Sequence, residues 1–162
     1  MPKNLLVLVL TCICYTGCMT TPALPEQQLA ALLQQHDIDV VINLRPKAAH
    51  AESLQQHGLQ SVHLPIHTRA IDREDLLQVM QQIQSAQAQQ QKVLIHCYHG
   101  ADRTGASVAM YRIIFEHWPV EQALAEMKYG GFGFHPIWVN IDALFHPENI
   151  KWIRQQLSNP SD

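Results

Sequence analysis

The chain has 162 residues, which is the size of one domain with a single hydrophobic core. Its formal net charge is −3, with 11 lysines and arginines against 14 aspartates and glutamates. This mildly acidic balance argues against nucleic acid or an anionic membrane surface as the main binding partner.

The first 18 residues have the features of a bacterial export signal. Lys3 precedes an apolar run from Leu5 to Ile13, which is too short to cross a bilayer as a mature helix, since that takes about 20 residues. The run ends in Tyr15-Thr16-Gly17-Cys18, which resembles the box where a bacterial lipoprotein receives lipid on its cysteine, although a leucine is usual in place of Tyr15. A β-strand over the same stretch is the alternative interpretation.

The export interpretation divides the chain into three parts. We expect a signal peptide over residues 1–17, a tether over 18–24 that begins with lipid on Cys18, and a folded domain over 25–162. The protein would then be anchored by lipid to a membrane of the bacterial envelope and face the periplasm. Cys97 would be the only thiol of the mature domain, so no internal disulfide is expected there.

Helices and strands are predicted to alternate along residues 25–162. Apolar residues at helical spacing, such as Leu76, Val79, Met80 and Ile83, favour helices, and short apolar runs favour strands. The predicted helices cover 25–36, 47–57, 72–88, 105–115, 120–128 and 147–157, and the predicted strands cover 40–44, 60–64 and 93–96. This order predicts an α/β fold with a small, mostly parallel central sheet flanked by helices.

The stretch around Cys97 carries the chemistry. The apolar residues 93–95 run into His96-Cys97, so we expect a buried central strand that leads through a short loop into an apolar helix. Backbone N–H groups in such a loop, with a helix N-terminus behind them, bind anions. Arg103 follows six positions after Cys97, and its planar guanidinium matches two phosphate oxygens. Amide dipoles and an arginine favour the thiolate form of a cysteine, so one loop holds a nucleophile and an oxyanion clamp.

This spacing resembles a known signature. His96-Cys97, five residues and then Arg103-Thr104 are similar to HC-x5-R-[S/T], the signature of the cysteine-dependent protein tyrosine phosphatases. The following Gly105 and the chain length most resemble the small dual-specificity branch. The resemblance implies that residues 25–162 are a phosphatase domain, which hydrolyses phosphate monoesters of tyrosine and of serine or threonine with no metal and no cofactor. That family opens with two short strands for which the tether has no room, so we expect a smaller sheet.

The resemblance also implies roles for the loop residues. Cys97 would form a phosphocysteine, Thr104 would assist its breakdown, and His96 would help to keep the thiol ionised. Gly100 would allow a backbone conformation that a side chain would forbid. The phosphate would be bound by the whole loop, which consists of Tyr98, His99, Gly100, Ala101, Asp102 and Arg103.

The family takes the proton for the leaving group from an aspartate upstream of the cysteine. Asp72, which lies 25 residues before Cys97, best matches that position. Asp72 also has the features of a helix N-cap, which would favour its charged form. Asp75 and Asp102 are the next candidates. The sequence Asp-Arg-Thr at 102–104 also occurs in phosphoinositide phosphatases of this superfamily, where that aspartate has been considered as a proton donor.

The same residues allow four other interpretations. A metal site on His96, Cys97 and His99 lacks a second Cys/His pair at zinc-type spacing. A rhodanese-like sulfur carrier usually has arginine directly after the cysteine, where this chain has Tyr98. A phosphoinositide or inositol phosphate phosphatase stays open, although residues 98–102 contain no lysine or arginine for further phosphates. A phosphate-ester binding module without turnover also stays open.

Overall fold

The fold is that of a computed structural model, which describes residues 31, 33–47 and 51–159. The predicted signal peptide, the lipid site at Cys18 and most of the predicted helix over 25–36 lie outside these residues. Within the described ranges, no helix is long and apolar enough to cross a membrane.

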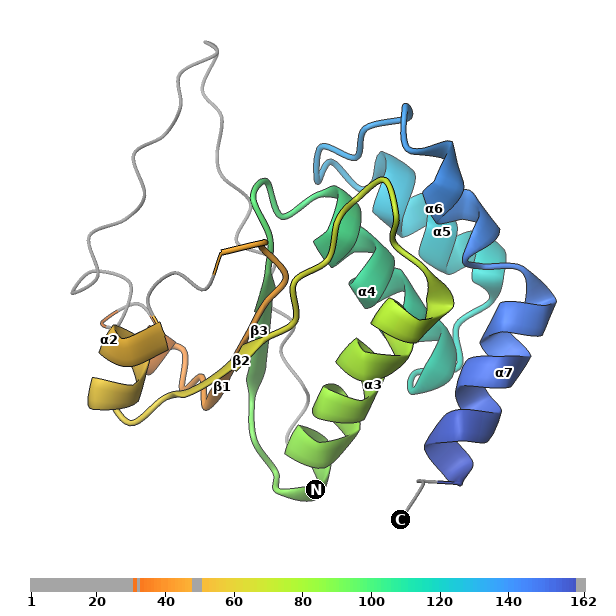
Figure 1. Ribbon diagram of the computed structural model, residues 1–162. Helices are drawn as coiled ribbons and strands as arrows, with labels where there is room; N and C mark the ends of the chain where they lie inside the picture. The colour runs from red at the N-terminus through yellow and green to blue at the C-terminus, as the bar shows by residue number, and fades with distance from the viewer. Residues whose placement is uncertain (1–30, 32, 48–50, 160–162) are drawn as a thin grey trace, which may run out of the picture.

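Three parallel strands form the sheet, as the sequence pattern predicts. They are β1 (Val40–Asn43), β2 (Gln60–His63) and β3 (Val93–His96), and their order in the sheet is β2-β1-β3 (Figure 1). Val40 lies opposite both Gln60 and Val93. The prediction that the strand before Cys97 is central is therefore wrong: β1 is central, and in the described part of the chain β3 lies at an edge.

Residues 31 and 33–35 are helical, and six helices follow β1 in the described part of the chain. They are α2 (Ala51–Gln56), α3 (Arg73–Ala88), α4 (Asp102–Ile114), α5 (Val120–Tyr129), α6 (Val139–Ala143) and α7 (Pro147–Ser158). One prediction needs correction: α4 begins three residues before Gly105. The described part of the helix expected over 47–57 is α2. The sequence does not predict α6, because five residues are too few for a helical period to show.

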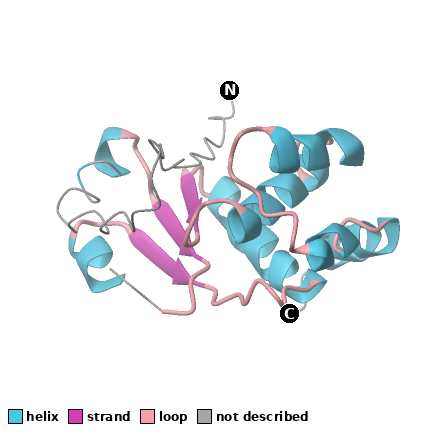
Figure 2. Cartoon of the chain, turned by 90° about the horizontal axis from the view of Figure 1, so that it is seen from above, coloured by secondary structure: helices cyan, strands magenta, loops and turns pink. Residues whose placement is uncertain are grey.

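The sheet separates two hydrophobic clusters, because successive side chains of a strand point to opposite faces. Val40 and Ile42 of β1 lie in the large cluster with the helices from α3 onward, and Val41 lies in a small cluster with Leu33 and Leu54. Figure 1 shows this arrangement, with α2 on one side of the sheet and α3, α4, α5 and α7 on the other, and Figure 2 shows helices on both sides of the strands. Burial on both faces explains why β1 and β3 are apolar almost throughout.

The parallel strands end at one edge of the sheet, and this edge positions the site. The loops that follow β1, β2 and β3 emerge together there, at the top of the view in Figure 1. Open α/β sheets bind ligands at the carboxyl ends of their strands. Cys97 directly follows β3, so it stands at this edge.

Candidate active site

Cys97 lies in a loop next to a helix N-terminus that no side chain caps. Its side chain is buried, with 8% exposed, and the loop turns at Gly100 with φ of 68°, which favours glycine as expected. The helix that follows, α4, has Ala101 at its N-cap and no side chain capping its N-terminus. Its first backbone N–H groups are therefore available to a bound oxyanion.

Arg103 ties the loop to the other two strands. Its Nη1 donates to the carbonyl oxygens of Leu44, which follows β1, and Ile66, which follows β2, both at 3.1 Å. The side chain is buried, with 7% exposed. One arginine thus joins the ends of all three strands and is held rigidly beside the Cys97 loop.

Two polar atoms at the start of α4 have no partner. Within the part of the chain that the structure describes, Nε of Arg103 and Oγ1 of Thr104 are buried and make no hydrogen bond. Buried polar groups are normally satisfied, so orphans call for an explanation. Nε is a charged donor and Oγ1 can donate or accept, so the oxygens of a bound phosphate are suitable partners.

Asp102 faces away from solvent and is bonded to a residue that the sequence did not mark. Its Oδ1 accepts from the backbone N–H of His135 at 2.9 Å, and its Oδ2 lies 3.0 Å from Nδ1 of His135. The ring of His135 also makes an edge contact with His99 of the loop, with centroids 5.8 Å apart. A lone histidine in a glycine-rich and aromatic segment gives no pattern, so only the fold shows that His135 belongs to the site.

Asp72 is the N-cap of α3. Its Oδ1 accepts from the backbone N–H of Asp75 at 2.9 Å, and Asp75 Oδ2 accepts from the N–H of Asp72 at 3.1 Å, which makes a capping box. The carboxylate of Asp72 is exposed, whereas burial raises the pKa of Asp75. The loop before them is tied to the start of α6, because Asn140 Nδ2 donates to the carbonyl of Thr68 at 2.8 Å. Capping by Asp72 is observed; its role as an acid stays a prediction.

A second arginine, also missed from the sequence, reaches the loop from the end of β1. The guanidinium carbon of Arg45 lies 4.3 Å from the ring centroid of Tyr98, and that of Arg103 lies 5.8 Å from the same centroid. Tyr98 is 57% exposed, beside the nucleophile. Since Arg45 is separated from Cys97 by more than 50 residues, only strand pairing brings it to the site.

Two predictions remain: the role of His96 and the alternative of a metal site. His96 is half-buried at the end of β3, where it pairs with Asn43, and its expected effect on the thiol stays a prediction. In the described ranges, no three His, Cys, Asp or Glu side chains are grouped so that they could hold a metal ion.

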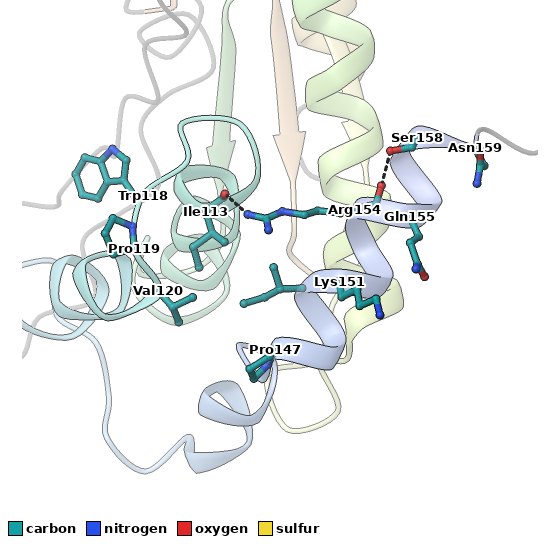
Figure 3. A pocket seen from close by; sticks show the side chains of 11 residues that line it. Ile113, Trp118, Pro119, Val120, Pro147, Lys151, Arg154, Gln155, Ser158 and Asn159 are labelled. Atoms are coloured by element: carbon teal, nitrogen blue, oxygen red, sulfur yellow. Dashed lines mark hydrogen bonds between the residues drawn. The ribbon is translucent and has the colours of Figure 1, made fainter.

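A large cavity lies elsewhere. Its volume is about 510 Å³, and it is formed between the end of α4, the start of α5 and one face of α7 (Figure 3). Arg154 crosses it and donates to the carbonyl of Ile113 at 3.0 Å. Ile113 and Cys97 are near opposite ends of α4, so this cavity is remote from the chemistry, and the loop geometry identifies the site better than cavity size.

Comparison with known sequences agrees with this geometry. The family "Dual specificity phosphatase, catalytic domain" matches residues 23–138. Two curated relatives, both named "Dual specificity protein phosphatase TpbA", come from Pseudomonas aeruginosa strains PAO1 and UCBPP-PA14 and are 34% and 35% identical over 137 residues. The matches cover 85% of this chain and 62% of each relative, so the chain spans less than two thirds of their length.

Solved structures show the same likeness. The crystal structure of P. aeruginosa TpbA is similar with a TM-score of 0.72 and 34% identity, over 85% of this chain and 84% of that one. A cysteine-to-serine variant of TpbA in complex with pTyr gives the same TM-score and identity over 85% and 83%. Tk-PTP in its active form has the same fold, with a TM-score of 0.58 and 21% identity over 85% and 88%.

Proposed function

Because the chain belongs to the dual specificity phosphatase family, we propose that it hydrolyses phosphate monoesters, with protein phosphotyrosine as the main substrate class, through a phosphocysteine on Cys97. The observation that carries this proposal is the pair of buried, unpartnered polar atoms of Arg103 and Thr104, next to an uncapped helix N-terminus in the described part of the chain. Further support comes from TpbA, whose structure was determined with pTyr. Phosphoserine and phosphothreonine are included because that relative is named a dual specificity phosphatase.

In the first step, Sγ of Cys97 attacks phosphorus in line with the ester oxygen. The S–P bond forms as the P–O bond to the leaving group breaks, and Asp72 gives its proton to the departing oxygen. Nε of Arg103 and the N–H groups of the loop and of α4 bind the equatorial oxygens, whose charge they stabilise in the transition state. Because Nη1 of Arg103 is held by two carbonyl groups, the guanidinium is positioned before substrate binds.

In the second step, water attacks the phosphocysteine. The new P–O bond replaces the S–P bond, the proton of the water returns to the carboxylate of Asp72, and inorganic phosphate leaves. Thr104, whose hydroxyl is buried at the start of α4, donates a hydrogen bond to the departing thiolate. The residues of this chain perform both steps without an added cofactor.

We also propose that the protein works at the bacterial envelope, anchored by lipid on Cys18. The support is the sequence alone: a lysine, a short apolar run and then the lipoprotein-like box that ends at Cys18. The phosphorylated substrates would then be periplasmic or exposed to the periplasm.

The test of the proposed function is turnover of p-nitrophenyl phosphate and of a phosphotyrosyl peptide by the purified chain, with a metal chelator present. Cys97→Ser should lose nearly all turnover while its thermal unfolding stays close to that of the wild type. Lys151→Gln, which changes an exposed side chain on α7, is the control and should retain activity. Turnover that survived in Cys97→Ser, or that stopped with the chelator, would refute the thiol mechanism.

A further inference from the structure

The residues beside Tyr98 form a group of positive charges. Arg45 follows β1 and lies against the Tyr98 ring, and its carbonyl oxygen is 2.8 Å from Nε2 of His63 at the end of β2. A hydrogen bond from Arg45 and its positive charge lower the pKa of Tyr98, and Lys47 and Arg103 act in the same direction. The electrostatic field at this side of the loop is therefore positive.

No carboxylate neutralises this group in the part of the chain that the structure describes. Arg45 makes no ion pair there, and its Nε is buried without a hydrogen-bond partner. The acid of the loop itself, Asp102, is buried and bonded to His135. Arg45 is half-buried, so its guanidinium is partly shielded from solvent and can still be reached by a carboxylate of a ligand bound at the loop.

We propose that Arg45, positioned by the ring of Tyr98, is a second anion subsite that selects phosphotyrosyl peptides with an acidic residue beside the phosphotyrosine. This proposal rests on the proposed phosphatase function. The planar guanidinium can bind a carboxylate through two parallel hydrogen bonds, and Tyr98 separates it from Arg103, which binds the phosphate being cleaved.

The placement of the charges favours one flanking carboxylate over a ligand with several phosphates. Among the described residues, the cations Arg45 and Lys47 lie on the Tyr98 side of the loop. The next residue of the loop, His99, contacts the ring of His135, which is bonded to the Asp102 carboxylate. A ligand with phosphates around a ring needs several cations around the loop, whereas a peptide needs only one cation beside the phosphotyrosine pocket.

The experiment compares pairs of phosphotyrosyl peptides that differ only by Glu or Gln at one position within three residues of the phosphotyrosine. The measured quantity is the ratio of kcat/KM for the Glu peptide to that for the Gln peptide, within one enzyme variant. At the best position the wild-type ratio should be roughly five- to tenfold, as a charge-assisted hydrogen bond partly screened by solvent would give. Arg45→Gln should reduce the ratio to about one, and Arg45→Glu should invert it.

Lys151→Gln serves as the matched control, because it removes a positive charge from an exposed position on α7, beside the remote cavity. Its ratio should equal that of the wild type. A ratio cancels differences in the fraction of active enzyme, so partial unfolding of an Arg45 variant does not obscure the result. Thermal unfolding of each variant reports that fraction independently.

The remaining outcomes separate the two proposals. Wild-type hydrolysis of all peptides with a ratio near one, or a ratio that persists in Arg45→Gln, overturns the subsite and leaves the phosphatase function intact. Faster hydrolysis of a soluble inositol polyphosphate than of every peptide overturns the choice of an acidic peptide. Absence of turnover on any phosphate ester overturns the proposed function, and the subsite proposal falls with it.

Discussion

Asp102 and His135 are joined by hydrogen bonds although 33 residues separate them in the chain. The carboxylate of Asp102 accepts from the backbone N–H of His135 at 2.9 Å and lies 3.0 Å from its Nδ1. Asp102 lies at the start of α4, in the loop that contains Cys97, and His135 lies between α5 and α6. The pair therefore fastens the segment after α5 to the wall of the active site.

The first prediction concerns this pair. Asp102→Asn should weaken the attachment and His135→Ala should remove the side-chain part of it. Because the carboxylate is buried but the His135 side chain is half exposed, the coupling should be about 1 kcal/mol. A double-mutant cycle measured by urea unfolding gives this number. Additive effects of the two substitutions would mean that the side chains do not interact in solution.

The second prediction separates the two roles of Asp72. Asn is as good an N-cap as Asp, whereas Ala is not, so Asp72→Asn should keep stability and Asp72→Ala should lose about 1 kcal/mol of unfolding free energy. If Asp72 is also the acid, Asp72→Asn should slow alkyl or tyrosyl phosphates by roughly 10²–10⁴-fold and activated aryl phosphates far less.

The comparison is made between leaving groups for each variant, with urea unfolding in parallel. We expect the leaving-group effect in Asp72→Asn. If Asp102→Asn instead slows alkyl or tyrosyl phosphates far more than activated aryl phosphates, then Asp102 in the Cys97 loop is the general acid. The same effect in Asp75→Asn would assign this role to the half-buried neighbour, whose pKa is raised by burial.

The third prediction concerns Arg103. The guanidinium of Arg103 donates from Nη1 to the carbonyls of Leu44 and Ile66, and its Nε is left to bind phosphate. In Arg103→Lys a single ammonium group takes the place of both nitrogen atoms. Lysine cannot make both sets of contacts, so kcat/KM for p-nitrophenyl phosphate should fall by roughly 10²–10³-fold, the scale of a lost oxyanion contact. A loss of less than tenfold, with unfolding unchanged, would show that the loop amides bind the phosphate without the guanidinium.

The fourth prediction concerns the proposed envelope location. The full-length chain expressed in a bacterium should fractionate with membranes, and mass spectrometry should find acyl groups at Cys18. Cys18→Ala should release the protein from the membrane fraction, whereas Cys12→Ala should leave it there. Wild-type protein at full mass in the cytoplasm would favour the alternative of a strand over residues 5–15.

The sequence by itself determined the family, the α/β fold with a parallel sheet and the place of the chemistry in the chain. These features depend on local patterns: the short runs of β1 and β3, the helical period of α3, and the spacing from His96 to Thr104. Local patterns survive without knowledge of the fold, because backbone conformation and the reach of one loop depend on neighbouring residues. The local pattern predicts a start of α4 at Gly105 rather than at Asp102, because the polar residues 102–104 show no helical spacing of apolar side chains.

Only the tertiary structure decided which strand is central and which distant residues complete the site. Among the described strands β1, not β3, is the middle one; both are apolar and largely buried, so their apolarity alone does not give the order. Arg45 reaches Tyr98, and His135 reaches Asp102, through contacts between segments far apart in the sequence. Such contacts follow from packing of the whole chain, and a single arginine or histidine carries no local signal of the neighbour it will meet.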